Sequence, residues 1–383
     1  MDQNPSPVKK RNGNSIVNWL ELPDHVVSLI SNKLIQIKDY IQFGSVCQPW
    51  HSIYTENRHH ISQQLPFLMI TTELNLSDEK TRSFYNVVEK KILNFKVRVH
   101  QNRIIVGSSH GWLVSIFRGN KRFISLLNPF LSVNNQIRLP YVRSKNFTDY
   151  DILAKVVLSK NPSSNPNDFI AMAILGPSHC QLACFKAGDK AWTYLPEKYC
   201  LMMDVLYYKD QFYCVNQFGK VFAFDLNDHH NPKITTVSPE IDHNTAGNRF
   251  LVESYGELLQ VCRLFRTELI GWNCRFVREY FYGGFHVFKL DPVGFKWIKM
   301  DNLEGRALFV GGNASISVLA SDFPGCKPNS VYLNDDYYEK TEQDGIRPHD
   351  IAVYSLVDDA IERHSPIGSK HRIQRTIWIE PTL

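Results

Sequence analysis

One short motif in the chain has residue types and spacing that could perform acyl-transfer chemistry. Gly107, Ser109 and Gly111 in "GSSHG" match the Gly-x-Ser-x-Gly pattern of a nucleophile elbow, which holds its serine on a strained turn between a strand and a helix. The flanking runs "RIIV" and "WLVSIF" are both typical of strands, so no helix follows to supply amide groups for an oxyanion. The sequence therefore predicts a structural turn between two strands and no catalytic residue.

Histidine and cysteine side chains, which are common metal ligands, cluster in three stretches: His59-His60, His229-His230 and "HCQLAC" (His179 to Cys184). Adjacent histidines on an extended loop cannot easily chelate one ion without further ligands nearby. The alternating positions of the third stretch are typical of a buried strand. The sequence therefore predicts no metal site. It also predicts no cofactor, because no glycine-rich stretch fits a phosphate loop of the GxxxxGK type.

Composition and charge narrow the class of protein. Apolar residues make up 43% of the 383 residues, which supports a substantial core, and the formal net charge is only +5. The basic residues are interspersed with acidic ones, so nucleic acid is not an expected partner. The chain begins with polar residues, and it contains no apolar run of the roughly 18 residues needed to cross a membrane, so no membrane partner is expected.

Cysteine usage points to a reducing compartment. The eight cysteines lie mostly inside apolar, strand-like stretches, without a CxxC pair or a disulfide-dense spacing. We therefore expect reduced core thiols and a location in the cytoplasm, the nucleus or both. The run Lys9-Lys10-Arg11 is either a nuclear address or a solvated part of the tail. Residues 1–17 as a whole lack periodicity and are expected to form a disordered leader.

From residue 96 to residue 383 the sequence predicts an all-β domain. Short apolar runs with period two are broken every eight to twelve residues by Gly, Asn, Asp or Pro. A hairpin unit recurs five times, at 113–127, 181–196, 221–239, 286–300 and 352–366. This repetition favours a mainly antiparallel β-propeller of five or six blades with long insertions, and a two-sheet sandwich is the alternative.

Several residues in these hairpins have expected structural roles. Trp192 and Trp297 occupy corresponding places in the second strand of their units, where a large ring could cover the seam between neighbouring sheets. Asp225, Asp291 and Asp358 recur in hairpin turns, and we expect them to be turn formers rather than catalytic carboxylates.

Residues 18–57 have helical spacing instead, and residues 58–95 are less regular and are expected to be a connector. Five apolar residues recur at helical spacing in the first segment and form one predicted face: Leu22, Val26, Leu29, Ile30 and Leu34. A second segment is predicted to place five residues on one side: Tyr40, Ile41, Phe43, Val46 and Cys47. Pro49 can open a third short helix, which would contain Trp50, Ile53 and Tyr54.

Three helices in so short a segment cannot enclose all of these apolar side chains. A domain below about 40 residues usually needs a disulfide, a metal or a partner for stability. This stretch offers neither of the first two, because it has a single cysteine and no ligand cluster. The sequence therefore predicts that another protein covers the surplus apolar surface, with Trp50 either anchoring that interface, closing the helical core, or doing both.

The same residues resemble a known family. Leu22-Pro23, the helically spaced apolar residues that follow, and "VCQPW" (Val46 to Trp50) are similar to an F-box, the module that binds the adaptor Skp1 and thereby joins a cullin-RING ubiquitin ligase. Gln48-Pro49 departs from the family, in which a basic residue commonly follows the cysteine. The resemblance implies ten Skp1-binding residues: Leu22, Pro23, Val26, Leu29, Ile30, Leu34, Ile41, Val46, Cys47 and Trp50.

The larger domain resembles a second family. "LEGRALFVGGNASISVLASDFPGCKPNSVYLNDD" (303–336), "DIAVYSLVDDAIE" and the terminal "IWIEP" are similar to the plant F-box-associated domain of unknown function with kelch-like repeats. "SSHGWLVSIF" and "LLNPFLSVNNQIRLP" match the start of that domain. Glu304-Gly305 stands where the family more often has Gly-Asp, which should alter one turn. The resemblance implies a kelch-like propeller.

Taken together, these patterns predict an α+β multidomain chain: leader 1–17, F-box 18–57, connector 58–95 and kelch-like propeller 96–383. The implied function is that of a non-catalytic substrate-recognition subunit of a Skp1-cullin-F-box (SCF) E3 ubiquitin ligase. Its implied partners are a Skp1-type adaptor, a cullin bound through that adaptor, and a target protein of unknown identity. The alternatives are a propeller enzyme with carboxylates or histidines at the channel, and a scaffold that does not lead to degradation.

Overall fold

The computed structural model describes residues 18–34, 37–57, 64–70, 81–98, 103–117, 123–131, 134–142, 153–176, 181–228, 230–241, 247–272, 275–334, 351–364 and 376–382. Contacts divide the chain into two units, Met1–Gln64 and Leu65–Leu383. The predicted leader 1–17 and the candidate ligands His59, His60, His179, Cys180 and His229 lie outside the described residues.

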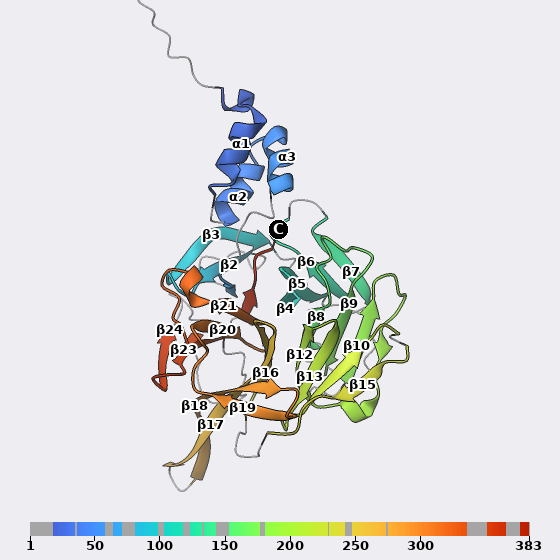
Figure 1. Ribbon diagram of the computed structural model, residues 1–383, viewed down its shortest axis with the longest axis vertical. Helices are drawn as coiled ribbons and strands as arrows, with labels where there is room; N and C mark the ends of the chain where they lie inside the picture. The colour runs from blue at the N-terminus through green and yellow to red at the C-terminus, as the bar shows by residue number, and fades with distance from the viewer. Residues whose placement is uncertain are drawn as a thin grey trace, which may run out of the picture. The chain divides into compact units, whose positions relative to one another are not determined.

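The first unit is helical, as predicted (Figure 1). Its elements are a 3-10 turn η1 (Trp19–Glu21) and three helices, α1 (Asp24–Ser31), α2 (Ile37–Gly44) and α3 (Gln48–Asn57). Local residues account for the helix starts. Asn18 caps η1 by accepting a hydrogen bond from the backbone N–H of Leu20, at 3.2 Å. Pro23 immediately precedes α1, and Pro49 lies in the first turn of α3, where a missing N–H costs no hydrogen bond.

The second unit consists of short strands. They are β1 (Phe67–Ile70), β2 (Thr81–Asn86), β3 (Lys91–Arg98), β4 (Arg103–Ser109), β5 (Trp112–Phe117), β6 (Phe123–Leu127), β7 (Gln136–Tyr141), β8 (Leu153–Leu158), β9 (Ile170–Leu175), β10 (Gln181–Lys186), β11 (Thr193–Tyr194), β12 (Met202–Tyr208), β13 (Gln211–Asn216), β14 (Val221–Asp225), β15 (Lys233–Thr236), β16 (Arg249–Ser254), β17 (Glu257–Trp272), β18 (Arg275–Asp291), β19 (Lys296–Met300), β20 (Arg306–Val310), β21 (Ser315–Leu319), β22 (Ser330–Asn334), β23 (Ile351–Ser355), β24 (Ala360–His364) and β25 (Ile377–Ile379). Two further 3-10 turns are η4 (Glu197–Tyr199) and η5 (Ala320–Asp322).

These strands form six sheets, which are the blades of a β-propeller (Figure 1). Four blades are consecutive antiparallel meanders: β4-β5-β6-β7, β8-β9-β10-β11, β12-β13-β14-β15 and β16-β17-β18-β19. A five-stranded blade, β21-β20-β22-β23-β24, contains a parallel pair between β20 and β22. The remaining blade, β25-β1-β2-β3, combines the end of the chain with its beginning. The structure thus confirms a mainly antiparallel propeller and sets the blade number at six.

The structure corrects the bounds of the predicted connector 58–95. Residues 67–70, 81–86 and 91–98 are strands of the blade completed by β25, so the β unit begins at Leu65 and not at residue 96. Two physical features hide this blade in the sequence. Its strands contain buried polar residues such as Arg82 and Ser83, which blur the period-two pattern, and its fourth strand lies almost three hundred residues away.

The five predicted hairpin units are all hairpins, but they are not all equivalent. Those at 181–196, 221–239 and 286–300 contain the third and fourth strands of their blades, and residues 352–364 contain the last two strands of the five-stranded blade. The unit at 113–127 instead contains the second and third strands, β5 and β6. Alternation alone cannot reveal the place of a hairpin in its blade, because successive antiparallel strands look alike.

Hydrogen bonds that involve serine hydroxyls join neighbouring blades around "GSSHG". Ser109 ends β4, and its hydroxyl accepts a hydrogen bond from the Leu158 backbone N–H of the next blade, at 3.0 Å. The Ser108 hydroxyl donates to the Trp378 carbonyl of β25. His110 and Gly111, both with positive φ (49° and 76°), make the tight turn to β5. The motif is therefore the predicted structural turn.

A buried ion pair joins the next blades. Lys155 of β8 and Asp204 of β12 lie 2.5 Å apart, with side chains only 4% and 2% exposed. The same carboxylate accepts a hydrogen bond from the Leu251 backbone N–H of β16, at 2.7 Å. Between the β16–β19 blade and the five-stranded blade, the hydroxyls of Ser254 in β16 and Ser317 in β21 are hydrogen-bonded to each other at 2.7 Å. Polar side chains on the first strands therefore bridge successive blades.

The last strand closes this ring. Trp378 of β25 is fully buried, its ring meets Phe309 edge-on at 5.2 Å between centroids, and its indole N–H donates to the Val310 carbonyl at 3.0 Å. On the other side, the chain end passes so close to the β4–β5 turn that a Cβ at Gly111 would lie 2.0 Å from the Thr382 hydroxyl. Glycine is therefore required there, both for its φ and for this approach.

Both predicted seam tryptophans have the expected role. Trp192 is buried between the β4–β7 and β8–β11 blades, and its indole N–H donates to the Pro140 carbonyl at 3.1 Å. Trp297 of β19 donates in the same way to the Pro239 carbonyl at 3.2 Å. In each case the indole N–H of one blade donates to a proline carbonyl of the preceding blade. Pro140 lies in β7 and Pro239 follows β15, and these are the outermost strands of their blades.

The recurring aspartates are turn formers, as predicted. The Asp225 carboxylate accepts from the Asn227 backbone N–H at 3.0 Å, and Asp291 accepts from Gly294 at 3.0 Å. That second hydrogen bond is the main cause of the lowered pKa of Asp291. Asp358 accepts from the hydroxyl of Ser355 at 2.7 Å.

Replacing Trp378 should test the closure. Because Trp378→Ala leaves a cavity in a buried seam and removes an indole hydrogen bond, it is expected to lower the free energy of unfolding by about 3–5 kcal/mol. Chemical denaturation followed by circular dichroism measures the loss. Trp297→Ala is the matched control. Because Trp297 is only partly buried, its replacement should lower the free energy of unfolding by less. An equal or smaller loss for Trp378→Ala would contradict the closing role of β25.

None of the described cysteines forms a disulfide, and the differences in their burial predict an order of alkylation. Burial raises the pKa of Cys184 to about 12 and that of Cys262 to about 11, so both remain protonated thiols at neutral pH. Cys47 and Cys200 are half-buried. In native protein at neutral pH, iodoacetamide should therefore modify Cys47 and Cys200 well before the buried thiols, as measured by peptide mass spectrometry. Early modification of Cys184 would contradict the described core.

Candidate functional site on the helical unit

A small set of side chains builds the core of the helical unit. Val27 of α1, Tyr40 and Phe43 of α2, and Ile53 and Tyr54 of α3 are all buried. The Tyr40 and Tyr54 rings lie 4.9 Å apart between centroids. These contacts explain why α2 and α3 pack together and why α1 turns its Val27 side inward.

Polar contacts complete this core. The Tyr40 hydroxyl donates to the Tyr54 carbonyl at 2.8 Å. The side-chain amide of Asn57 donates to the hydroxyls of Ser28 and Ser31 in α1, at 2.8 and 2.9 Å. The last turn of α3 is thereby tied to α1, and the three helices form one unit.

The predicted apolar face of α1 lies outside this core. Val27 and Ser31, four residues apart, face inward and are buried. Val26 and Ile30 are half-buried, and Leu29 is 62% exposed. At about 100° per residue, the face made by these three residues lies roughly a third of a turn away from the buried one. The helix therefore has two apolar sides, and the structure of this unit covers only the narrower one.

The second predicted face is split between core and surface, which corrects the expectation that its residues share one side. Tyr40 and Phe43 point into the core, whereas Ile41 is half-buried and Val46 is 51% exposed. Val46 and Cys47 follow the end of α2, so helical spacing no longer applies to them.

Trp50 occupies an intermediate position. Its ring packs against Phe43 at 4.8 Å between centroids, yet the side chain is only half-buried. This geometry is compatible with both predicted roles of Trp50, closing the helical core and anchoring a partner.

None of the ten predicted Skp1-binding residues is fully buried. Seven are half-buried: Leu22, Val26, Ile30, Leu34, Ile41, Cys47 and Trp50. Pro23, Leu29 and Val46 are exposed. Sequence reasoning missed two further apolar side chains, Trp19 and Leu20, which are each 60% exposed in η1. The signal was present as an apolar pair in "NWLELP", but the search for helical periodicity began at Leu22.

No group of three or more His, Cys, Asp or Glu side chains that could hold a metal ion occurs among the described residues. None of the helices described is long and apolar enough to span a bilayer. What the site presents is therefore an apolar surface on a small, internally complete helical scaffold.

The fold and this surface define the chain as a β-propeller protein with a helical module. Residues 84–355 match the family model described as the KIB1-4 beta-propeller, and the chain belongs to this family. The match begins inside β2, in agreement with a β unit that starts before residue 96. The kelch-like character of the propeller remains a prediction.

Relatives in Arabidopsis thaliana extend over both units. The chain is 24% identical to F-box protein SKIP23, with 91% of each chain covered, and 24% identical to F-box protein At2g26160, with 83% of this chain and 96% of that protein covered. Among solved structures, apo AztD from Citrobacter koseri has a TM-score of 0.35 at 10% identity, over 83% of this chain and 99% of that chain. That likeness is too low to support any argument.

Gly44 provides a test of the helical packing. A Cβ at this position would lie 2.6 Å from Cγ of Tyr54, so Gly44→Ala must displace the Tyr54 ring and should destabilise the unit by about 1–3 kcal/mol. Hydrogen-exchange protection of residues 37–57 measures the effect. The neighbouring exposed variant Ser45→Ala should leave protection nearly unchanged. Unaltered protection in Gly44→Ala would argue against the described α2–α3 contact.

Proposed function

We propose that this chain is the substrate-recognition subunit of a Skp1-cullin-F-box ubiquitin ligase. Its helical unit would bind a Skp1-type adaptor, and through it a cullin, while the propeller would bind a target protein. One observation supports this proposal above the others: the helical unit completes its own core with Val27, Tyr40 and Tyr54, and still leaves Leu29 and Val46 largely exposed. Its relatives are named F-box proteins.

The exposed side chains suit a protein partner. Leu29 and Val46 are large apolar groups that would gain from removal from water, and a half-buried Trp50 is pre-positioned by Phe43. Aromatic residues held in this way are typical anchors of interfaces, because little conformational entropy is lost on binding. A stable complex of this kind should bury about 1,200–2,000 Å² in total.

In this function the chain makes and breaks no covalent bond. The adaptor and cullin hold a ubiquitin-loaded enzyme near the target, so lysine amines of the target meet the thioester at high local concentration. Tethering of this kind supplies effective concentrations in the millimolar range, which is enough to drive a slow bimolecular transfer. The propeller contributes by keeping the target bound, and we expect the chain to act in the cytoplasm, the nucleus or both.

The alternative of a propeller enzyme has no comparable support. Ser109 is engaged by the Leu158 backbone, and Asp225 and Asp291 accept turn hydrogen bonds, so the residues that first suggested chemistry have structural roles. A scaffold that does not lead to degradation would use the same helical surface and differs only in the consequence of target binding.

Leu29→Asp and Trp50→Ala should test the proposed interface in the full chain. Because Leu29 is exposed, Leu29→Asp should leave folding intact while placing a charge in an apolar interface. Trp50→Ala should weaken binding to a purified Skp1-type adaptor by about 2 kcal/mol, roughly thirtyfold. Isothermal titration calorimetry measures both effects.

Ser52→Asp is the matched control, since Ser52 is exposed on α3 and outside the predicted set. It should bind the adaptor as the wild type does. The proposal fails if the wild-type chain does not bind, or if Leu29→Asp and Trp50→Ala bind with unchanged affinity while remaining folded.

A further inference from the structure

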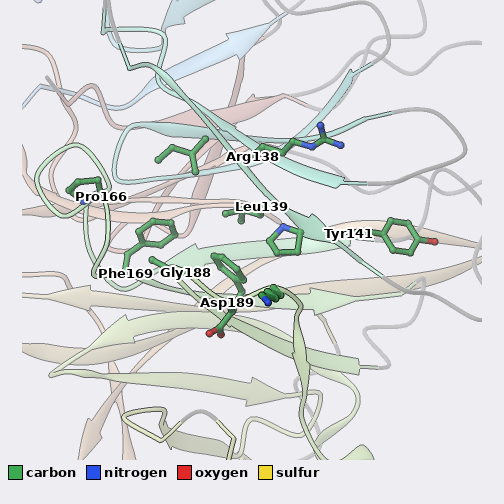
Figure 2. Close-up of a pocket in the computed structure, with 12 residues that line it drawn as sticks. Arg138, Leu139, Tyr141, Pro166, Phe169, Gly188 and Asp189 are labelled. Carbon is green, nitrogen blue, oxygen red and sulfur yellow. The ribbon is translucent and has the colours of Figure 1, made fainter.

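A groove of about 480 Å³ lies between two blades of the propeller (Figure 2). One wall is β7, the outermost strand of the β4–β7 blade, and the other comes from two turns of the next blade, which contribute Pro166, Phe169, Gly188 and Asp189. In Figure 2, Pro166 and Phe169 lie toward one end of the groove, whereas Arg138 and Tyr141 extend from β7 away from them. The two sides of the groove therefore differ chemically.

The floor of the groove is apolar and rigid. Leu139, Phe169 and Phe185 line it and are each at least 95% buried. Phe185 is backed by the Trp192 ring at 5.6 Å between centroids, and Trp192 is fixed by its hydrogen bond to Pro140. Because these rings are packed by their neighbours, the groove offers an apolar side chain a small, preformed contact area.

The rim of the groove has an excess of positive charge. Arg138 lies with its guanidinium 3.6 Å above the Phe123 ring, and no described acidic side chain forms an ion pair with it. Desolvation by burial lowers the pKa of Arg103, and repulsion from the Arg138 guanidinium lowers it further. Lys190 is exposed on the opposite wall beside Asp189, the acidic residue of the lining, so the lining has two cations and one carboxylate. A negative group bound here would reduce the repulsion between the two guanidinium groups.

The backbone along the groove favours an extended partner. β7 pairs with β6 on one side, and no described strand pairs with its other edge. An extended peptide can lie along such an edge and place alternate side chains into one groove. Pro140 limits this edge, because it has no N–H and its carbonyl already accepts from Trp192.

We infer that this groove is the target-binding site of the propeller, and that it takes an extended, acidic peptide segment with one bulky apolar side chain. The apolar side chain would rest on Phe169 and Phe185, and carboxylates on either side of it would face Arg138 and Lys190. This inference rests on the proposed function for the identity of the ligand as a target protein, but the groove itself can be tested independently.

The test uses the full chain and four fluorescein-labelled synthetic peptides, measured by fluorescence polarisation. Three have a central Phe flanked by alternating Ser and either Glu, Gln or Lys, and the fourth has a central Ala between Glu-containing flanks. The Glu-flanked Phe peptide should bind most tightly, the Gln version about fivefold more weakly, and the Lys version more weakly still. Replacing Phe with Ala should cost about tenfold or more.

Variants locate the binding. Arg138→Gln combined with Lys190→Gln should weaken the Glu-flanked peptide about tenfold and leave the Gln-flanked peptide nearly unchanged. Lys299→Gln, an exposed charge on β19 outside the groove, is the matched control and should have no effect. Thermal unfolding checks that each variant is folded.

The inference is overturned if no peptide binds at about 1 mM, if the order of the peptides differs, or if Lys299→Gln weakens binding as much as the groove variants. Adaptor binding by the same proteins separates the two proposals. The groove variants should bind the Skp1-type adaptor normally. If the chain binds the peptide but not the adaptor, the groove inference holds and the proposed ligase function fails. If it binds the adaptor but not the peptide, the proposed ligase function holds and the groove inference fails.

Discussion

The pairing of the last strand of the chain with the first blade is the constraint on which the propeller depends. β25 supplies the first strand of a blade whose other three strands come from the start of the β unit, and it binds both neighbouring blades through Trp378 and the Ser108 hydroxyl. Without it, the blade made by β1–β3 would lose its innermost strand, and two blade seams would lose their contacts. The ring is therefore stabilised by one segment that forms its contacts only when the whole β unit has folded.

Closure also explains the distribution of buried polar groups. The desolvation cost of burying the Asp204 carboxylate is offset because it meets Lys155 from one blade and the Leu251 amide from the next. Within the described part of the helical unit no such closure occurs. A few aromatic and aliphatic side chains form its core, and the apolar side chains of Leu29 and Val46 remain largely exposed. The propeller thus pairs its buried polar groups within itself, whereas the helical unit has exposed apolar side chains that suit a partner.

The limits of sequence reasoning follow from how each signal arises. Helices α1–α3, the seam tryptophans Trp192 and Trp297, and the turn at His110-Gly111 were predictable, because each depends on local spacing or on a residue with a strong conformational preference. The blade that contains β1–β3 was not, since its partner strand is distant in sequence and its own strands contain buried Arg82 and Ser83. The exposed Trp19 was missed because it belongs to a 3-10 turn, which has no helical period.

Sequence by itself determined the two-part organisation, the helical character of residues 18–57 and the mainly antiparallel β architecture of residues 96–383. These properties depend on the periodicity of apolar residues, which is set by residues close together in the sequence. Only the tertiary structure decided the six-blade count, the closing role of Trp378, and which apolar residues of the helical unit are core and which remain outside. The physical reason is that periodicity states that a side chain is apolar and on a given face, whereas burial depends on which distant segment comes to cover that face.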